Sequence, residues 1–126
     1  MPASLDMKIL VVDDHESMRK IEKQILNDLG YKNVDMADDG TTALPMLQKG
    51  SYDFVISDWN MPQMEGIDLL KAIRADERIG KTPVLLVTAE SKKEKIIEAA
   101  QAGVNDYVVK PFNADILSEK ISRIFP

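Results

Sequence analysis

Residues 8–14 read KILVVDD, a lysine and four apolar residues followed by two aspartates. An extended chain that is apolar on both faces is typical of a strand in a parallel sheet that helices cover on both sides. Four later stretches are short apolar runs of the same kind, and four of the five runs are nearly all apolar. Together they predict five strands: Lys8–Val12, Asn33–Ala37, Phe54–Ser57, Pro83–Thr88 and Tyr107–Val109.

The segments between these runs have apolar residues at helical spacing. The residues concerned are Met18, Ile21, Ile25 and Leu29 in the first segment, Leu69, Leu70 and Ile73 in the third, Ile96, Ile97 and Ala100 in the fourth, and Ile116, Leu117, Ile121 and Ile124 in the fifth. Strands that alternate with helices indicate five βα units. We therefore expect a flavodoxin-like, doubly wound α/β fold whose parallel strands have the order 2-1-3-4-5.

Glycines mark the ends of the predicted helices, and one proline lies inside a predicted helix. Glycine is favoured just after a helix, and four of the six glycines follow a helical segment, namely Gly30, Gly50, Gly80 and Gly103. Pro45 falls inside the second helical segment, Thr41–Lys49, where it removes a backbone donor. We expect that helix to start late or to bend.

The length and composition of the chain argue against several classes of function. Its 126 residues suit one domain, which we assign to residues 7–126, with residues 1–6 as a flexible extension. The net charge of -5 and the lack of a basic run argue against nucleic-acid binding. No apolar stretch approaches the roughly 20 residues that cross a bilayer, and no signal peptide is evident, so we expect a cytoplasmic protein. The absence of cysteine excludes thiolate catalysis.

Polar side chains follow four of the predicted strands. Asp13 and Asp14 come after the first strand and Asp58 after the third. Thr88 ends the fourth strand and Lys110 follows the fifth. Because the carboxyl ends of parallel strands share one edge, and ligands bind where the strand order reverses, we expect the three carboxylates in one crevice. Their mutual repulsion and their oxygen donors favour a divalent cation, Mg²⁺ in particular.

Asp58 is the predicted phosphoryl acceptor, because a carboxylate beside a bound metal suits phosphoryl transfer. Lys110 would give positive charge to the phosphoryl oxygens, and the Thr88 hydroxyl would donate a hydrogen bond to one of them. Each residue alone has a simpler interpretation as a helix cap, a turn residue or a surface lysine. Their joint occurrence at the ends of four strands favours the functional interpretation.

Four motifs surround these polar residues. They are Val11-Val12-Asp13-Asp14, Ser57-Asp58-Trp59-Asn60-Met61-Pro62, Val87-Thr88-Ala89-Glu90 and Val109-Lys110-Pro111-Phe112. The motifs resemble the receiver domains of two-component response regulators, and the resemblance runs from about Lys8 to Phe125. Asp58–Pro62 and Ala99–Gly103 resemble the CheY-like chemotaxis regulators in particular.

The resemblance implies that a chemotaxis-type histidine kinase phosphorylates Asp58. It implies that Mg²⁺ is held by Asp14, Asp58 and the backbone carbonyl of Asn60, and that Asp13 contacts the ion mostly through water. The protein would then be a phosphoacceptor switch, not an enzyme, with at most self-catalysed phosphorylation and dephosphorylation. A phosphatase is a further possible partner, and we expect a monomer.

The resemblance also implies a conformational switch. Thr88 would turn toward the phosphoryl group while Tyr107 moves inward, which changes the surface formed by the fourth helix, the fifth strand and the fifth helix. In CheY-like proteins this surface binds the flagellar motor switch protein. The Lys110-Pro111 step matches a position where the family commonly has a cis bond.

Two other functions use similar residues. A phosphohydrolase with an aspartyl nucleophile usually has an acid two residues later, where this chain has Asn60. A flavin-binding module fits poorly, because the acidic turn after the first strand repels a cofactor phosphate. A receiver domain cut from a longer regulator also stays open. His15 and Asp106 depart from the family pattern; we interpret His15 as an exposed residue at the start of a helix and leave both roles open.

Overall fold

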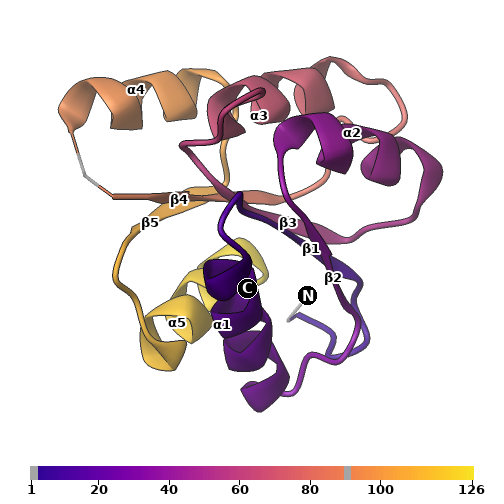
Figure 1. Ribbon diagram of the computed structural model, residues 1–126, viewed down its shortest axis with the longest axis vertical. Helices are drawn as coiled ribbons and strands as arrows, with labels where there is room; N and C mark the ends of the chain where they lie inside the picture. The colour runs from indigo at the N-terminus through magenta and orange to yellow at the C-terminus, as the bar shows by residue number, and fades with distance from the viewer. Residues whose placement is uncertain (1–2, 90–91) are drawn as a thin grey trace.

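The computed structural model describes residues 3–89 and 92–126, which form a parallel five-stranded sheet between two layers of helices (Figure 1). The elements are β1 (Ile9–Val12), α1 (Glu16–Asp28), β2 (Val34–Ala37), α2 (Gly40–Lys49), β3 (Phe54–Asp58), α3 (Gly66–Ala75), β4 (Val84–Thr88), α4 (Lys93–Gln101), β5 (Asp106–Val109) and α5 (Ala114–Ile124). The strand order is β2-β1-β3-β4-β5, so the predicted fold class and order are confirmed. Met1 and Pro2 of the predicted extension, and Glu90 of the third motif, lie outside the described residues.

Each face of the sheet has its own apolar core. Figure 1 shows α1 and α5 on one side of the sheet and α2, α3 and α4 on the other. In β1, Ile9 and Val11 pack into the core under α1 and α5, whereas Leu10 and Val12 pack into the core under the other three helices. All four side chains are fully buried. Because both faces are apolar, the strand is an uninterrupted apolar run, which is the feature that predicted it.

The buried faces of two helices differ from the predicted ones. In α1, Ile21 is 51% exposed, whereas Glu22 is only 2% exposed beside the buried Leu26. In α4, Ala99 is buried while Ile97 is exposed. Each residue turns a helix by about 100°, so a shift of one position moves a side chain from the core to the flank of the helix. Among the described residues, no helix has both the length and the apolar character needed to cross a membrane.

The second helix does not start late, so that part of the expectation for Pro45 was wrong. α2 begins at Gly40 because the Asp39 side chain accepts a hydrogen bond from the backbone N–H of Thr41, and Pro45 lies inside the helix. The glycines after α1 and α4 have the conformations that such positions require. Gly30 has a φ of 103° and Gly103 a φ of 90°, a left-handed region that side chains disfavour.

Candidate functional site

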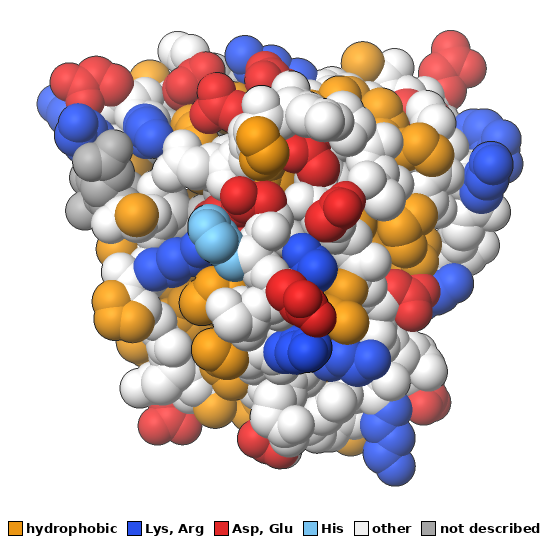
Figure 2. Space-filling model, in the orientation of Figure 1, with side chains coloured by type: hydrophobic (Ala, Val, Ile, Leu, Met, Phe, Trp, Pro, Cys, Tyr) orange, Lys and Arg blue, Asp and Glu red, His pale blue; other side chains and the backbone are white. Residues whose placement is uncertain are grey.

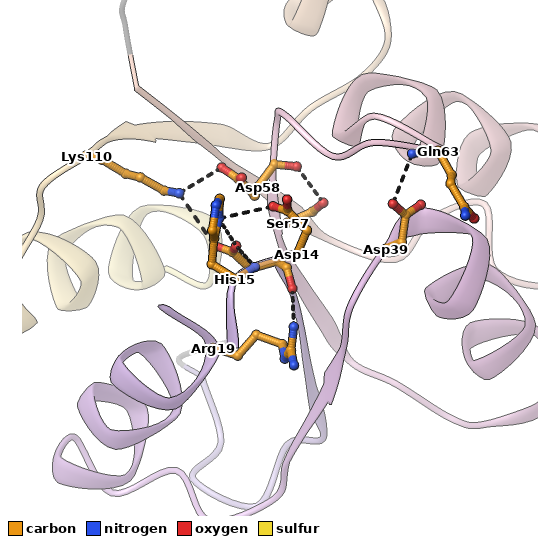
Figure 3. A network of polar contacts seen from close by, with 9 residues as sticks. Asp14, His15, Arg19, Asp39, Ser57, Asp58, Gln63 and Lys110 are labelled. Carbon is orange, nitrogen blue, oxygen red and sulfur yellow. Dashed lines mark hydrogen bonds and ion pairs between the residues drawn. The ribbon is translucent and has the colours of Figure 1, made fainter. Parts of the chain in front are cut away.

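Four strands bring polar side chains to one edge of the sheet. Asp13 follows β1 directly, Asp58 is the last residue of β3, Thr88 is the last residue of β4, and all three are buried. Lys110 follows β5. Figure 3 shows that Asp58, Asp14 and Lys110 point into the same space. The structure thus brings these residues together, while the roles assigned to them stay predictions.

The Lys110 ammonium group bridges two buried carboxylates. Its Nζ lies 3.1 Å from Oδ1 of Asp58 and 3.5 Å from Oδ2 of Asp13. Burial raises the pKa of the Asp58 carboxyl above its usual value, the hydrogen bond and charge of Lys110 act against this rise, and Asp13 and Asp14 add to it. Burial acts to lower the pKa of Lys110, but its pairing with Asp58 prevails and raises it. One ammonium group therefore offsets only part of the negative charge of three carboxylates.

The acidic cluster retains oxygen atoms for a cation. Oδ1 of Asp14 is buried and accepts no hydrogen bond from the described residues. One donor atom from each of Asp13, Asp14, His15 and Asp58 lies within 4.8 Å of the others. A buried oxygen without a partner beside two further carboxylates fits a divalent cation, which would neutralise the repulsion between them. The side chains present therefore suit Mg²⁺.

Two contacts hold Asp13 in place. The backbone N–H of His15 donates to Oδ1 of Asp13 at 2.9 Å, and the Arg19 guanidinium donates to the Asp13 carbonyl at 2.8 Å. Both donors belong to α1 or to the residue that precedes it. The His15 N–H therefore holds the Asp13 carboxylate, and Arg19 of α1 holds the Asp13 backbone.

Asn60 lies on the loop after β3, at an open depression that Asp14 and His15 also line. This loop is tied to the start of α2 by Asp39, whose carboxylate accepts hydrogen bonds from the backbone N–H groups of Gln63 at 3.2 Å and Met64 at 2.9 Å. Figure 3 shows the bond to Gln63. Asp39 therefore has two structural roles: it caps α2, and it anchors the loop that carries Asn60.

The predicted switch residues lie on neighbouring strands. Thr88 ends β4, and Tyr107 lies in β5 with its ring half-buried against the core under α4. The Lys120 ammonium lies 5.4 Å from the centre of the Tyr107 ring and 3.4 Å from Oδ1 of Asp106. Asp106 therefore pairs with a lysine of α5 at the surface that contains Tyr107.

Glu22 is the residue of this region that sequence reasoning missed. Glu22 is buried, and its Oε2 has no hydrogen-bond partner among the described residues. Burial and the charge of Asp13 raise the pKa of Glu22 to about 8, although the charge of Lys110 acts to lower it. The only signal in the sequence is its position four residues after Met18, on the same face of α1.

Comparison with known proteins places these features in a family. Residues 9–122 match the response regulator receiver domain. The chain belongs to this family. The receiver domain is 66% identical over 119 residues to the chemotaxis protein CheY of Pseudomonas aeruginosa, with 94% of this chain and 96% of the relative covered. It is 64% identical over 120 residues to CheY-3 of Vibrio cholerae, with 95% and 92% covered.

Solved receiver domains share its fold. The structure of Vibrio cholerae CheY4 has a TM-score of 0.89 and 39% identity, with 95% of this chain and 99% of that chain covered. The receiver domain of the Pseudomonas aeruginosa sensor histidine kinase PA1611 has a TM-score of 0.84 and 30% identity, with 94% and 96% covered, and contains a magnesium ion coordinated in the active site cleft. The predicted resemblance to CheY-like receivers of two-component systems is confirmed, and proteins of this kind are signalling switches.

Proposed function

We propose that this receiver domain is a CheY-like switch that accepts a phosphoryl group on Asp58 with the help of Mg²⁺. The observation that carries the proposal is the arrangement at the edge of the sheet, where Asp58 lies 3.1 Å from Lys110 and within 4.8 Å of donor atoms from Asp13 and Asp14. We assign residues 7–126 to the domain, because the family match covers residues 9–122 and Met7 is buried in the core.

The proposed reaction uses few protein groups. A carboxylate oxygen of Asp58 attacks the phosphorus of a phosphohistidine; the new P–O bond forms as the P–N bond breaks, and the histidine nitrogen keeps the electron pair and takes up a proton. Lys110 then pairs with a phosphoryl oxygen, and the Thr88 hydroxyl donates to another. Mg²⁺, held by Asp14, Asp58 and the Asn60 carbonyl with Asp13 acting through water, would neutralise charge on the transferred group.

Phosphorylation would change the surface around Tyr107. The new negative charge draws Thr88 toward the phosphoryl group, and the space released near the end of β4 admits the Tyr107 ring. Strands β4 and β5 are paired side by side, with Leu86 opposite Tyr107, so a change in one strand reaches the other directly. The proposed donor is a chemotaxis histidine kinase and the proposed target is a flagellar motor switch protein, in keeping with the chemotaxis relatives.

The test has two stages. The protein is incubated with acetyl phosphate and Mg²⁺, and incorporation is measured by intact mass; we expect one phosphoryl group on the wild type and none on Asp58→Asn or in excess chelator. A motor-switch peptide should then bind the phosphorylated protein more tightly, with a smaller gain for Thr88→Val. Incorporation by Asp58→Asn would refute the acceptor, and equal peptide affinity before and after phosphorylation would refute the switch.

A phosphohydrolase is the second candidate, since an aspartyl phosphate could be released to water. It requires an acid near the nucleophile, and the nearest equivalent, two residues after Asp58, is the amide Asn60. Rapid multiple turnover of a phosphate ester would support this candidate over a switch.

A further inference from the structure

The chain has a single histidine, and it lies at the mouth of the acidic cluster. His15 is the residue before α1, yet its side chain makes no capping hydrogen bond. Its side chain is 65% exposed, so the ring is accessible from solvent. Figure 2 shows the histidine on the visible surface with acidic side chains beside it. The imidazole is therefore available to a ligand.

The ring nitrogen is close to two carboxylates. Nδ1 of His15 lies 3.3 Å from Oδ1 of Asp13 and 3.2 Å from Oδ1 of Asp14. The Asp14 oxygen is buried and accepts no hydrogen bond, despite this short distance. Nδ1 is within hydrogen-bond distance of Asp13, with the donor set by the ring tautomer, so a bound cation would take the place of that proton between the ring nitrogen and the carboxylates.

The size of the cluster also suits coordination. The four donor atoms, one each from Asp13, Asp14, His15 and Asp58, lie within 4.8 Å of one another. Ligands on opposite sides of a transition ion are about 4.2 Å apart, since each bond is about 2.1 Å long. Small side-chain rotations would therefore bring His15 Nδ1, Asp14 and Asp58 to one ion, with Asp13 beside it.

The nitrogen changes which ions the site should prefer. Carboxylate and carbonyl oxygens suit Mg²⁺, whereas imidazole suits first-row transition ions, whose affinity rises along the series from Mn²⁺ through Co²⁺ to Cu²⁺. We propose that His15 Nδ1 is a ligand at this site and that it makes the receiver domain select divalent transition ions over Mg²⁺. The inference rests on the proposed function, because it uses the same carboxylates.

If His15 is only a solvated residue at the start of a helix, a different effect on metal affinity is expected. An imidazole that only neighbours the site would affect all divalent ions alike through its electrostatic effect. A ligating imidazole affects ions according to their affinity for nitrogen. The ratio of affinities for Co²⁺ and Mg²⁺ separates the two interpretations.

The first experiment measures Kd for Co²⁺ and for Mg²⁺ by calorimetry on protein without a histidine tag. His15→Phe keeps an aromatic ring but removes both nitrogens, and should weaken Co²⁺ binding by about 10-fold or more while changing Mg²⁺ binding little. The matched control is Asp68→Asn, which removes an exposed carboxylate from the same depression and should shift both affinities together. An unchanged affinity ratio in His15→Phe would overturn the proposal.

The second experiment detects the bond itself. Protein labelled with ¹⁵N only in histidine is loaded with Mn²⁺, and pulsed electron paramagnetic resonance measures coupling between the ion and nitrogen. Because the chain has one histidine, a coupling typical of direct ligation can come only from His15. We expect it in the wild type, and its absence there would refute ligation. If Mg²⁺ binds and Asp58 is phosphorylated without nitrogen coupling, only this inference fails; if no divalent ion binds the wild type, the proposed function fails as well.

Discussion

The Asp58 carboxylate is subject to opposing influences that together define the site. Burial and the neighbouring charges of Asp13 and Asp14 raise its pKa, and Lys110, 3.1 Å away, acts to keep it ionised. An ionised carboxylate is the nucleophilic form, so Lys110 supports reactivity before any phosphoryl group arrives. The same ammonium group would later pair with the phosphoryl oxygens.

Glu22 adds a further acidic group to this region, and it should lower stability. Its folded-state pKa of about 8 lies above the ordinary 4.5, so the folded protein keeps a proton that the unfolded chain releases. The contribution of Glu22 to stability should therefore fall as pH rises from about 4.5 to about 8, by up to about 1.4 kcal/mol per pH unit.

Glu22→Leu should remove this dependence and stabilise the protein near pH 7.5 by about 1–3 kcal/mol, because no polar group is then left buried without a partner. The control Glu22→Gln loses the titration but keeps a buried polar group, so its gain should be smaller. Urea unfolding in chelator at pH 5 and pH 7.5 measures both effects. If wild type and Glu22→Leu differ in their free energy of unfolding by the same amount at pH 5 and at pH 7.5, the raised pKa of Glu22 is contradicted.

At the scale of elements, α2 and the loop after β3 depend on one carboxylate. Asp39 caps α2 through Thr41 and holds Gln63 and Met64, close to Asn60. Burial acts to raise the pKa of Asp39, but the hydrogen bonds from these three backbone groups prevail and lower it. The stability that it contributes is present above about pH 4 and is lost as pH falls through the lowered pKa.

Asp39→Ala should destabilise the protein by about 2–3 kcal/mol, since it removes a helix cap and leaves backbone donors without partners. It should also weaken Mg²⁺ binding by about 10-fold, because the loop that carries Asn60 loses its anchor. The neighbouring Asp38→Ala is the control, as Asp38 accepts an exposed hydrogen bond from the Thr42 hydroxyl at 2.7 Å. Urea unfolding and calorimetry compare the two variants, and similar losses in both would argue against the anchoring role.

The elements were predictable to different degrees. Strand positions were predicted to within one residue at every end, because most of these strands are covered on both faces and are therefore apolar nearly throughout. The buried face of α1 was not predicted. Ile21 and Glu22 lie about 100° apart around the helix, and tertiary packing decides which of them faces the sheet. The sequence pattern contains no information about that packing.

At the scale of the whole molecule, the parallel topology concentrates charge. A chain with net charge -5 has three carboxylates at one edge of its sheet, opposed mainly by Lys110. The convergence of Asp13, Asp58 and Lys110 was predictable because the carboxyl ends of parallel strands must meet. The contacts of His15, and those of Asp39 with the loop after β3, were not predictable, because they depend on the path of the loops between the strands.

This topology predicts that Mg²⁺ stabilises the folded state. At a concentration 100 times its Kd, Mg²⁺ should add about 2.7 kcal/mol to the free energy of unfolding. Asp14→Asn should abolish this gain and should raise stability in chelator, because one repelling charge is gone. Thermal unfolding with Mg²⁺ and with NaCl at equal ionic strength measures both effects. An equal gain in NaCl, or in Asp14→Asn, would show general screening of charge and no specific site.

The central claim is that Asp58 is the residue that receives the phosphoryl group, and the most direct test locates that group chemically. Protein phosphorylated with acetyl phosphate and Mg²⁺ is treated with borohydride, which reduces an aspartyl phosphate to homoserine, and peptide mass spectrometry then identifies the converted position. The arrangement of Lys110 and the acidic cluster around Asp58 predicts conversion at position 58 alone. Conversion at Asp13 or Asp14, or a phosphorylated protein without any converted aspartate, would contradict the account.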